Sequence, residues 1–420
     1  MPQTLQEWLS HLESIHPKTI ALGLERVAEV ASRMDLVPKY PVITVGGTNG
    51  KGSVCAMLEA ILLAAGYRVG LYTSPHLLTY NERVRIAGQQ VPDEALCDSF
   101  AAIEQARGET QLTYFEYGTL AAVHGFNMHK VDVAILEVGL GGRLDAVNIF
   151  DADCAVVTTI DLDHMDYLGD TREQIACEKA GIFRMGRPAI FGDADMPDAI
   201  ASEAARIGAK LYRLGKDFGP DIGMQQWNYR GQIPRYSLPF PALRGTFQLN
   251  NASTVLAILD QMHEQLPVSM DSVRRGLLEV TLPGRFQVLP GKPVIILDVA
   301  HNPHAAHSLA GNLAAMPHAG KSLAVCAMLN DKDMQGVVRE MAGQVDEWLL
   351  AGISAPRGAS AEALAEAVRA EAPQARYQLF QTVTLALQHA CEAAGEDDRI
   401  LAFGSFYTVA EAMSARKVVR

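Results

Sequence analysis

Short apolar runs alternate with segments of helical periodicity through most of the chain. The runs in the first part that predict buried strands span residues 42–45, 69–72, 131–137, 155–160 and 188–191. A second series spans residues 294–299, 323–327, 348–351 and 400–403. Apolar residues at helical spacing lie between most of these runs. This alternation is typical of parallel sheets that are covered by helices.

The pattern changes twice. From about Leu214 to Pro241 the chain is rich in Gly, Pro, Tyr and Trp, which predicts hairpins at a sheet edge. Two Pro-Gly breaks in "TLPGRFQVLPGKP" then precede the second series of strands. We therefore predict two α/β domains: residues 1–289, which contain a parallel sheet, and a smaller domain at residues 290–420.

Composition limits the classes of function. The 420 residues are 49% apolar and carry a net charge of -12, with a pI of about 5.5. Such a chain is a poor candidate for sequence-independent binding of nucleic acid or of an anionic membrane. No apolar run approaches the length of a membrane span, and the N-terminus does not resemble a signal peptide. The six cysteines lack metal-site spacing, so we expect reduced thiols in a cytoplasmic protein.

The stretch "VITVGGTNGKGSV" joins a predicted strand to a predicted helix through a glycine-rich turn that carries one lysine. Unpaired backbone N–H groups at a helix N-terminus suit phosphate, and Lys51 adds a positive charge. The match to a Walker A loop is imperfect, because Val45 replaces the first glycine and Gly52 separates Lys51 from Ser53. The alternative is a tight turn without a ligand. We expect this turn to bind nucleotide phosphate.

The form G-T-N-G-K-G-S resembles the ATP loop of the Mur ligase superfamily, and further segments narrow the resemblance to its folylpolyglutamate synthase and dihydrofolate synthase branch. These segments are "YTSPHLLTYNERVRI", "LTYFEYGTLAA", "LEVGLGGRLDAVN", "DLDHMDYLG", "EKAGIFR", "LPGRFQ", "LDVAHNPHA" and "GSFYTV". They occur in the family's order over nearly the whole chain. The resemblance implies a P-loop-type ATPase domain, a Rossmann-like second domain and an active site in the cleft between them.

The resemblance also implies roles for individual residues. The residues expected to contact ATP are Thr48, Asn49, Gly50, Lys51, Gly52, Ser53, Asn251, Arg285 and Asp298. Those expected to contact the pterin substrate are Thr19, Ile20, Ala21, Thr113, Tyr114, Phe115, Glu116, Leu144, Asp145 and Ala146. We expect His301 near the transferred phosphate. Asn251 is as well explained by helix capping, and Phe115 by packing in the core.

Magnesium ligands are implied at Ser74, Glu137 and His164, with the Ser53 hydroxyl serving a second ion that is bound to ATP. Glu137 ends a predicted parallel strand, where ligands sit in such folds, although a solvated carboxylate at a strand end is the alternative. An isolated histidine such as His164 is more often structural. We assign no ligand role to Asp161, Asp163 or Asp166.

Lys179 lies on the apolar face of a helix that Thr171 and Gln174 can cap. Its stem could pack while its ammonium reaches water. In the family, the matching lysine is carbamylated and helps to bind magnesium, so we expect Lys179 as a carbamate.

The implied activity is ATP-dependent amide ligation with two Mg²⁺ ions. The expected substrates are dihydropteroate, tetrahydrofolate with its polyglutamates, and L-glutamate, and we expect a monomer. A P-loop kinase or GTPase, a nucleotide-gated binding protein, and an enzyme with folylpolyglutamate synthase activity alone are the alternatives.

Overall fold

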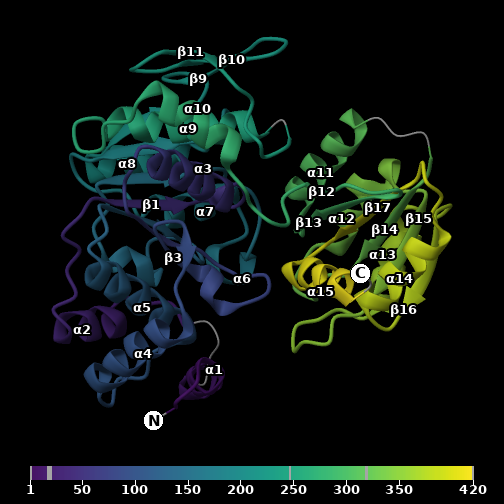
Figure 1. The fold of residues 1–420 in the computed structure, drawn as a ribbon, viewed down its shortest axis with the longest axis horizontal. Coiled ribbons are helices and arrows are strands. Elements are labelled where there is room, and N and C mark those ends of the chain that lie inside the picture. The colour runs from purple at the N-terminus through teal and green to yellow at the C-terminus, as the bar shows by residue number, and fades with distance from the viewer. Residues whose placement is uncertain (1, 17–20, 246, 317–319, 419–420) are drawn as a thin grey trace. The chain divides into compact units, whose positions relative to one another are not determined.

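The chain forms two α/β units, each built around a mainly parallel sheet (Figure 1). The structure is a computed structural model, and it describes residues 2–16, 21–245, 247–316 and 320–418. Unit 1 comprises Met1–Ala242 and Leu249–Val280, and unit 2 comprises Leu243–Gln248 and Thr281–Arg420. The main division therefore falls at Thr281, whereas the sequence places the domain boundary at residue 290.

Unit 1 contains an eight-stranded sheet in the order β4-β3-β2-β5-β1-β6-β7-β8. The six strands from β2 to β8 in this order pair in parallel, and β3 and β4 extend the sheet with antiparallel pairs. The strands are β1 (Val42–Gly46), β2 (Val69–Tyr72), β3 (Val84–Ile86), β4 (Gln89–Gln90), β5 (Val133–Glu137), β6 (Cys154–Val157), β7 (Pro188–Phe191) and β8 (Lys210–Arg213).

The central strands are buried on both faces, which explains their continuous apolar sequences.

The helices before Thr281 are α1 (Leu5–Ile15), α2 (Glu25–Arg33), α3 (Lys51–Ala64), α4 (Asp93–Arg107), α5 (Tyr114–His129), α6 (Met165–Leu168), α7 (Arg172–Ala180), α8 (Asp198–Ile207), α9 (Phe247–Gln261) and α10 (Met270–Glu279), with 3-10 turns η1 (Tyr80–Arg83) and η2 (Ala146–Ile149). Helix α3 packs on β1, β2 and β5 and against α10. A second core joins α1, α2, α4, α5, α7 and α8 to the sheet.

The predicted hairpin region forms a separate antiparallel sheet of β9 (Gly219–Ile222), β10 (Trp227–Arg230) and β11 (Arg235–Leu238). Buried Asp260 on α9 connects this small sheet to the rest of unit 1. It accepts hydrogen bonds from the Tyr229 hydroxyl at 2.9 Å and from Arg235 Nη1 at 2.6 Å. The small sheet is thus attached to α9 rather than added to the edge of the large sheet.

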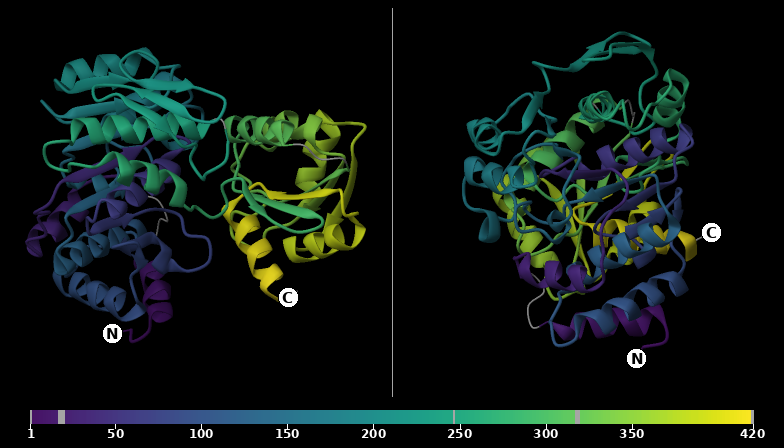
Figure 2. Two further views of the ribbon diagram at one scale, coloured as in Figure 1. Left: turned by 45° about the horizontal axis from the view of Figure 1, so that its top comes forward. Right: turned by 90° about the vertical axis from the view of Figure 1, so that its left-hand side faces the viewer.

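Unit 2 has a six-stranded sheet in the order β12-β13-β17-β14-β15-β16, in which only β12 is antiparallel. Helices cover both faces (Figure 2): α11, α12 and α13 share one core, and α14 and α15 pack on β14, β15 and β17. The strands are β12 (Gln287–Leu289), β13 (Val294–Asp298), β14 (Ser322–Cys326), β15 (Glu347–Ala351), β16 (Arg376–Phe380) and β17 (Arg399–Phe403). The helices are α11 (Pro303–Ala315), α12 (Met334–Met341), η3 (Ala342–Gln344), α13 (Ala361–Glu371), α14 (Val383–Ala393) and α15 (Phe406–Val418).

The predicted fold class is confirmed in both units. All six cysteines are thiols outside any disulfide bond, and three of them are buried. Among the described residues, no helix has both the length and the hydropathy to cross a membrane.

Candidate functional site

The glycine-rich turn leaves the carboxyl end of β1, which lies between β5 and β6 in the sheet. The turn is fixed to the chain that follows β6: Thr48 N donates to Thr159 O at 2.8 Å, and Asn49 N donates to Thr159 Oγ1 at 3.0 Å. The Thr158 hydroxyl donates to Asn49 O at 2.6 Å. No side chain caps the start of α3. The first amides of α3 can therefore bind an anion at the carboxyl edge of the sheet.

Two glycines give the turn its shape. Gly47 has φ +139°, and a Cβ there would lie 1.9 Å from Thr158 Oγ1. Gly50 has φ +87°, and a Cβ there would lie 2.9 Å from Asn251 Oδ1 on α9. Asn251 is buried, and its side chain lies against the turn.

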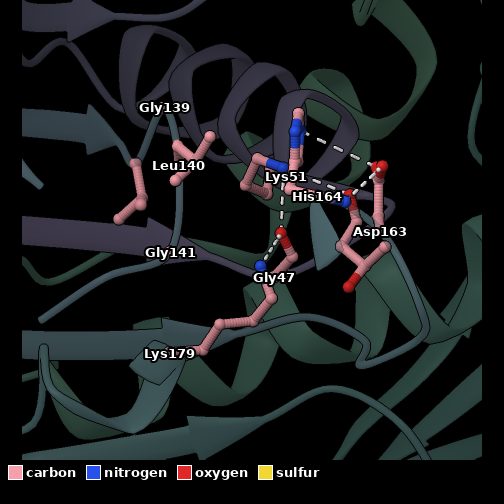
Figure 3. A pocket seen from close by; sticks show the side chains of 10 residues that line it. Gly47, Lys51, Gly139, Leu140, Gly141, Asp163, His164 and Lys179 are labelled. Atoms are coloured by element: carbon pink, nitrogen blue, oxygen red, sulfur yellow. Dashed lines mark hydrogen bonds and ion pairs between the residues drawn. The ribbon is translucent and has the colours of Figure 1, made fainter. Parts of the chain in front are cut away.

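Lys51 begins α3 and turns back onto its own loop. Its Nζ donates to Gly47 O at 2.9 Å and to Thr48 O at 3.2 Å (Figure 3). The ammonium group is thus held over the loop where a phosphate would lie. To reach a phosphate oxygen it has to exchange these carbonyl contacts for the stronger charge-assisted one.

Lys179 on α7 points to the same carbonyl. Its Nζ donates to Gly47 O at 2.9 Å, and the residue is 5% exposed. The predicted capping box of Thr171 and Gln174 is present at the start of α7. Burial and the charge of Lys51 lower the pKa of Lys179 to about 7. A large fraction of this amine is therefore neutral near pH 7, which is the form that reacts with carbon dioxide.

A pocket connects these groups. It is lined by Gly47, Thr48, Lys51, Val138, Gly139, Leu140, Gly141, Asp163, His164 and Lys179 (Figure 3). His164 precedes α6 with φ +53°, and its Nε2 lies 3.9 Å from Asp163 Oδ2. The sequence assigned no role to Asp163, which lines the pocket and also favours the charged form of Lys179.

Glu137 ends β5 next to this pocket. It is 5% exposed, and it pairs in register with Val45 at the end of β1. Its Oε2 accepts a hydrogen bond from Ser74 N at 3.1 Å, which brings together two of the expected metal ligands from β5 and from the segment after β2.

The expected ligands comprise one buried carboxylate, the Ser53 and Ser74 hydroxyls and the His164 imidazole, of which the structure brings Glu137 and Ser74 into contact. Oxygen donors suit a Mg²⁺ ion that retains several waters. Among the described residues, no three His, Cys, Asp or Glu side chains cluster as a metal site. A hydroxyl-rich and sparse set of ligands is therefore the arrangement that these side chains can offer.

The three predicted substrate segments lie side by side in unit 1, although Thr19 and Ile20 fall outside the described residues. Arg26 Nη2 donates to Ala21 O at 2.8 Å and to Glu116 Oε1 at 2.9 Å. Gly23 N donates to Leu144 O at 3.4 Å. Arg26, which the sequence did not single out, therefore joins the first two segments. Its pairing with a glutamate 90 positions away left no local signal.

Several side chains in these segments have structural partners. Thr113 and Glu116 form the capping box of α5, so neither side chain is simply available to a ligand. Phe115 is half-buried. Its ring centroid lies 5.8 Å from that of Tyr72, and a Cβ on Gly139 would lie 2.7 Å from its Cζ.

Asp145 fixes the loop that follows β5. Its Oδ2 accepts from Gly139 N at 3.0 Å and from Leu140 N at 2.9 Å, and its Oδ1 accepts from Val147 N at 3.1 Å. Burial outweighs these hydrogen bonds and raises its pKa to about 6. Ala146 is buried beside it, whereas Leu144 is 39% exposed.

Three expected residues lie together in unit 2. Asp298 ends β13 and accepts from Phe286 N and Ala300 N, each at 2.7 Å. Burial raises the pKa of Asp298, and the nearby charge of Arg285 opposes that rise. Arg285 Cζ lies 5.0 Å from the ring centroid of Phe406, and the His301 ring lies 6.4 Å from the same ring. Unit 2 thus presents an arginine, a carboxylate and a histidine around the carboxyl end of β13.

Comparison with known proteins identifies both parts of the chain. The family model "Mur ligase middle domain" matches residues 45–259, and the model "Mur ligase, glutamate ligase domain" matches residues 284–406. The dihydrofolate synthase/folylpolyglutamate synthase of Escherichia coli K12 is 48% identical over 413 residues, which cover 97% of this chain and 94% of that protein.

Two solved structures share the whole architecture. E. coli FolC in complex with DHPP and ADP has a TM-score of 0.94 at 47% identity, with 100% of both chains covered. A bifunctional folylpolyglutamate synthase/dihydrofolate synthase with Mn, AMPPNP and L-glutamate bound has a TM-score of 0.91 at 48% identity, with 99% of this chain and 98% of that chain covered. The chain therefore belongs to the Mur ligase family, in its dihydrofolate synthase/folylpolyglutamate synthase branch.

Proposed function

We propose that the chain is an ATP-dependent ligase that joins L-glutamate to dihydropteroate, forming dihydrofolate, and to the glutamate tails of tetrahydrofolate and its polyglutamates. The observation that carries this proposal is the meeting at one sheet edge of a phosphate-binding turn, a buried carboxylate and a buried lysine. The relatives support this proposal, since one of their structures holds DHPP with ADP and another holds Mn, AMPPNP and L-glutamate.

The reaction proceeds by activation of the acyl group. The substrate carboxylate attacks the γ-phosphorus of ATP, and the bond to the β-phosphate oxygen breaks, giving an acyl phosphate and ADP. The α-amine of glutamate then attacks the carbonyl carbon. The tetrahedral intermediate expels phosphate, and the nitrogen loses a proton to give the amide.

The chain's part in this reaction is to bind, orient and neutralise charge. Thr48, Asn49, Gly50, Gly52 and Ser53 surround the phosphates with backbone and hydroxyl groups, and Lys51 supplies a positive charge. Asn251, Arg285 and Asp298 bind the rest of ATP, and His301 acts near the transferred phosphate. Helix capping does not explain Asn251, because α9 already begins at Phe247. Its side chain lies against Gly50 in the turn, which supports a contact with the nucleotide.

We propose two Mg²⁺ sites. Ser53 serves the ion that ATP carries, and Ser74, Glu137 and His164 hold the other together with the carbamate of Lys179. Bound magnesium would neutralise the phosphate charge that develops during transfer. The low pKa of Lys179 supports a carbamate, because the neutral amine is the nucleophile toward carbon dioxide.

The pterin site is proposed to consist of Thr19, Ile20, Ala21, Thr113, Tyr114, Phe115, Glu116, Leu144, Asp145 and Ala146. Contacts between the described members of this set support one site rather than three separate segments. Because Thr113 and Glu116 cap α5, we expect their contribution to come mainly through the position of Phe115 and the backbone.

The test is coupled release of ADP, measured with dihydropteroate or tetrahydrofolate and with or without L-glutamate. We expect sustained release only when an acyl substrate and glutamate are both present. Release without glutamate would favour a kinase or GTPase, and no release under any condition would favour a binding protein. Glutamate-dependent activity with tetrahydrofolate but not with dihydropteroate would restrict the enzyme to folylpolyglutamate synthesis. L-Aspartate serves as the control amine, because its shorter side chain misplaces the distal carboxylate.

A further inference from the structure

Arg83, at the end of η1, is held in a fixed position by three side chains. Its Nε donates to His76 Nδ1 at 2.8 Å. Its Cζ lies 5.3 Å from the ring centroid of Tyr80 and 5.4 Å from that of Tyr114. These contacts use the Nε atom and place the guanidinium group over two aromatic rings, so they orient the side chain without hydrogen-bonding its terminal nitrogens.

The terminal nitrogens of Arg83 have no hydrogen-bond or ion-pair partner among the described residues. Nearby arginines differ in this respect. Arg85 pairs with Glu59 at 3.2 Å, and Arg26 pairs with Glu116 at 2.9 Å. Arg83 is therefore a partly exposed cation whose Nε is fixed by His76 and whose two terminal nitrogens have no partner among the described residues.

Arg83 lies between the expected metal ligands and the expected pterin segments. Its carbonyl oxygen accepts from Thr73 N at 2.9 Å, directly before Ser74. On the other side, its guanidinium group lies over Tyr114, which begins α5 beside Phe115. A substrate that reaches from the pterin segments to the metal ligands would pass this side chain.

We propose that Arg83 binds a carboxylate of the acyl substrate through its two terminal nitrogens. The planar fork of arginine matches a carboxylate in a bidentate manner, and preorganisation by His76, Tyr80 and Tyr114 lowers the entropic cost of binding. This inference rests on the proposed function, which supplies the acid substrate. Dihydropteroate has one carboxylate, the reacting one, whereas tetrahydrofolate also has an α-carboxylate that does not react.

The test compares Arg83→Gln and Arg83→Lys with the unsubstituted enzyme. Arg275→Gln is the matched control, since Arg275 is 65% exposed on α10 and pairs only with Glu279 among the described residues. The KM for the acyl substrate should rise about 10- to 100-fold in Arg83→Gln, because a hydrogen-bonded charge pair is lost. If Arg83 binds the α-carboxylate, kcat should change much less, because binding to a group that does not react is nearly uniform along the reaction, whereas loss of a contact with the reacting carboxylate should lower kcat as well. Arg83→Lys, which keeps the charge but not the fork, should restore only part of the affinity.

The two acyl substrates identify the carboxylate. A higher KM for both substrates assigns Arg83 to the carboxylate that reacts, and a higher KM for tetrahydrofolate alone assigns it to the α-carboxylate. A binding measurement gives a second readout: the unsubstituted enzyme should bind pteroate more tightly than its methyl ester, and Arg83→Gln should reduce that preference if the reacting carboxylate is the ligand.

Unchanged KM values for both substrates in folded Arg83→Gln would overturn the inference. The melting temperature of each variant shows whether it is folded, and Arg83→Lys provides the answer if Arg83→Gln does not fold. If the unsubstituted enzyme shows no glutamate-dependent release of ADP, the proposed function has failed instead. The two failures are therefore distinguishable.

Discussion

Lys179 Nζ donates a hydrogen bond to the carbonyl oxygen of Gly47 over 2.9 Å, although the two residues are 132 positions apart in the chain. The contact joins the buried face of α7 to the turn that precedes α3. A change in the charge of Lys179 therefore acts directly on the glycine-rich turn, which we propose binds phosphate.

Replacement of this lysine tests the proposed carbamate. Lys179→Ala should reduce ligase activity by roughly 100-fold or more, because an anionic metal ligand is lost. Small carboxylates should restore part of the activity by occupying the vacated space. Mass spectrometry of the gently handled unsubstituted enzyme should show the added mass of carbon dioxide on the peptide that contains Lys179. An active, metal-bound enzyme with an unmodified Lys179 would contradict the carbamate.

Glu137→Gln tests whether the carboxylate at the end of β5 binds metal. The amide oxygen can still accept the hydrogen bond from Ser74 N, so the local fold should survive while the charge is lost. We expect turnover to fall by about 100-fold and the magnesium concentration that gives half-maximal activity to rise. Calorimetry checks the fold. A collapse of the melting temperature with magnesium dependence unchanged would make Glu137 a structural residue.

Gly47→Ala tests the close approach between the turn and the segment after β6. The new Cβ would lie 1.9 Å from Thr158 Oγ1 on a backbone with φ +139°. The matched control is Gly66→Ala, because Gly66 has φ +90° but a Cβ there would have no atom within 4 Å. The control should cost about 1 kcal/mol of the free energy of unfolding, and Gly47→Ala clearly more. Urea unfolding and ATP binding measure the two effects, and equal losses of stability would mean that Thr158 moves aside freely.

The buried carboxyl group of Glu59 should make the free energy of unfolding depend on pH. This glutamate on α3 is 3% exposed, and burial raises its pKa, although Arg85 at 3.2 Å opposes the rise. A carboxyl whose pKa is higher in the folded state favours folding while it is protonated, and this contribution is lost as the pH rises through the folded pKa. Glu59→Gln removes the buried charge and should therefore be more favourable, relative to the unsubstituted protein, at pH 8 than at pH 4.

Thermal unfolding at the two pH values gives the measurement for Glu59→Gln. We expect the difference in melting temperature between variant and unsubstituted protein to rise by roughly 2 °C from pH 4 to pH 8. Glu279→Gln is the control, because Glu279 is 57% exposed in its pair with Arg275. If both variants respond alike, the buried charge of Glu59 is not responsible.

The sequence by itself determined the central strands, because a strand buried on both faces must be apolar throughout. The predicted runs at residues 69–72 and 188–191 coincide with β2 and β7, and the other seven overlap strands within a few residues. Strands β4 and β16, which were not predicted, lie at sheet edges and expose most of their residues. Their mixed polar sequences resemble loops, and pairing with a neighbour makes them strands.

The same division holds at the site. Local patterns were sufficient for the glycine-rich turn between β1 and α3, the capping box at Thr171 and the position of Lys179 on an apolar face, since each depends on neighbours within a few residues. Only the tertiary structure decided that Lys179 contacts Gly47, that Arg26 joins two of the predicted substrate segments and that Arg83 keeps its terminal nitrogens without a partner among the described residues. These relationships depend on which strands lie side by side in the sheet. Strand order brings distant loops to one edge, and no periodicity within a single segment encodes that order.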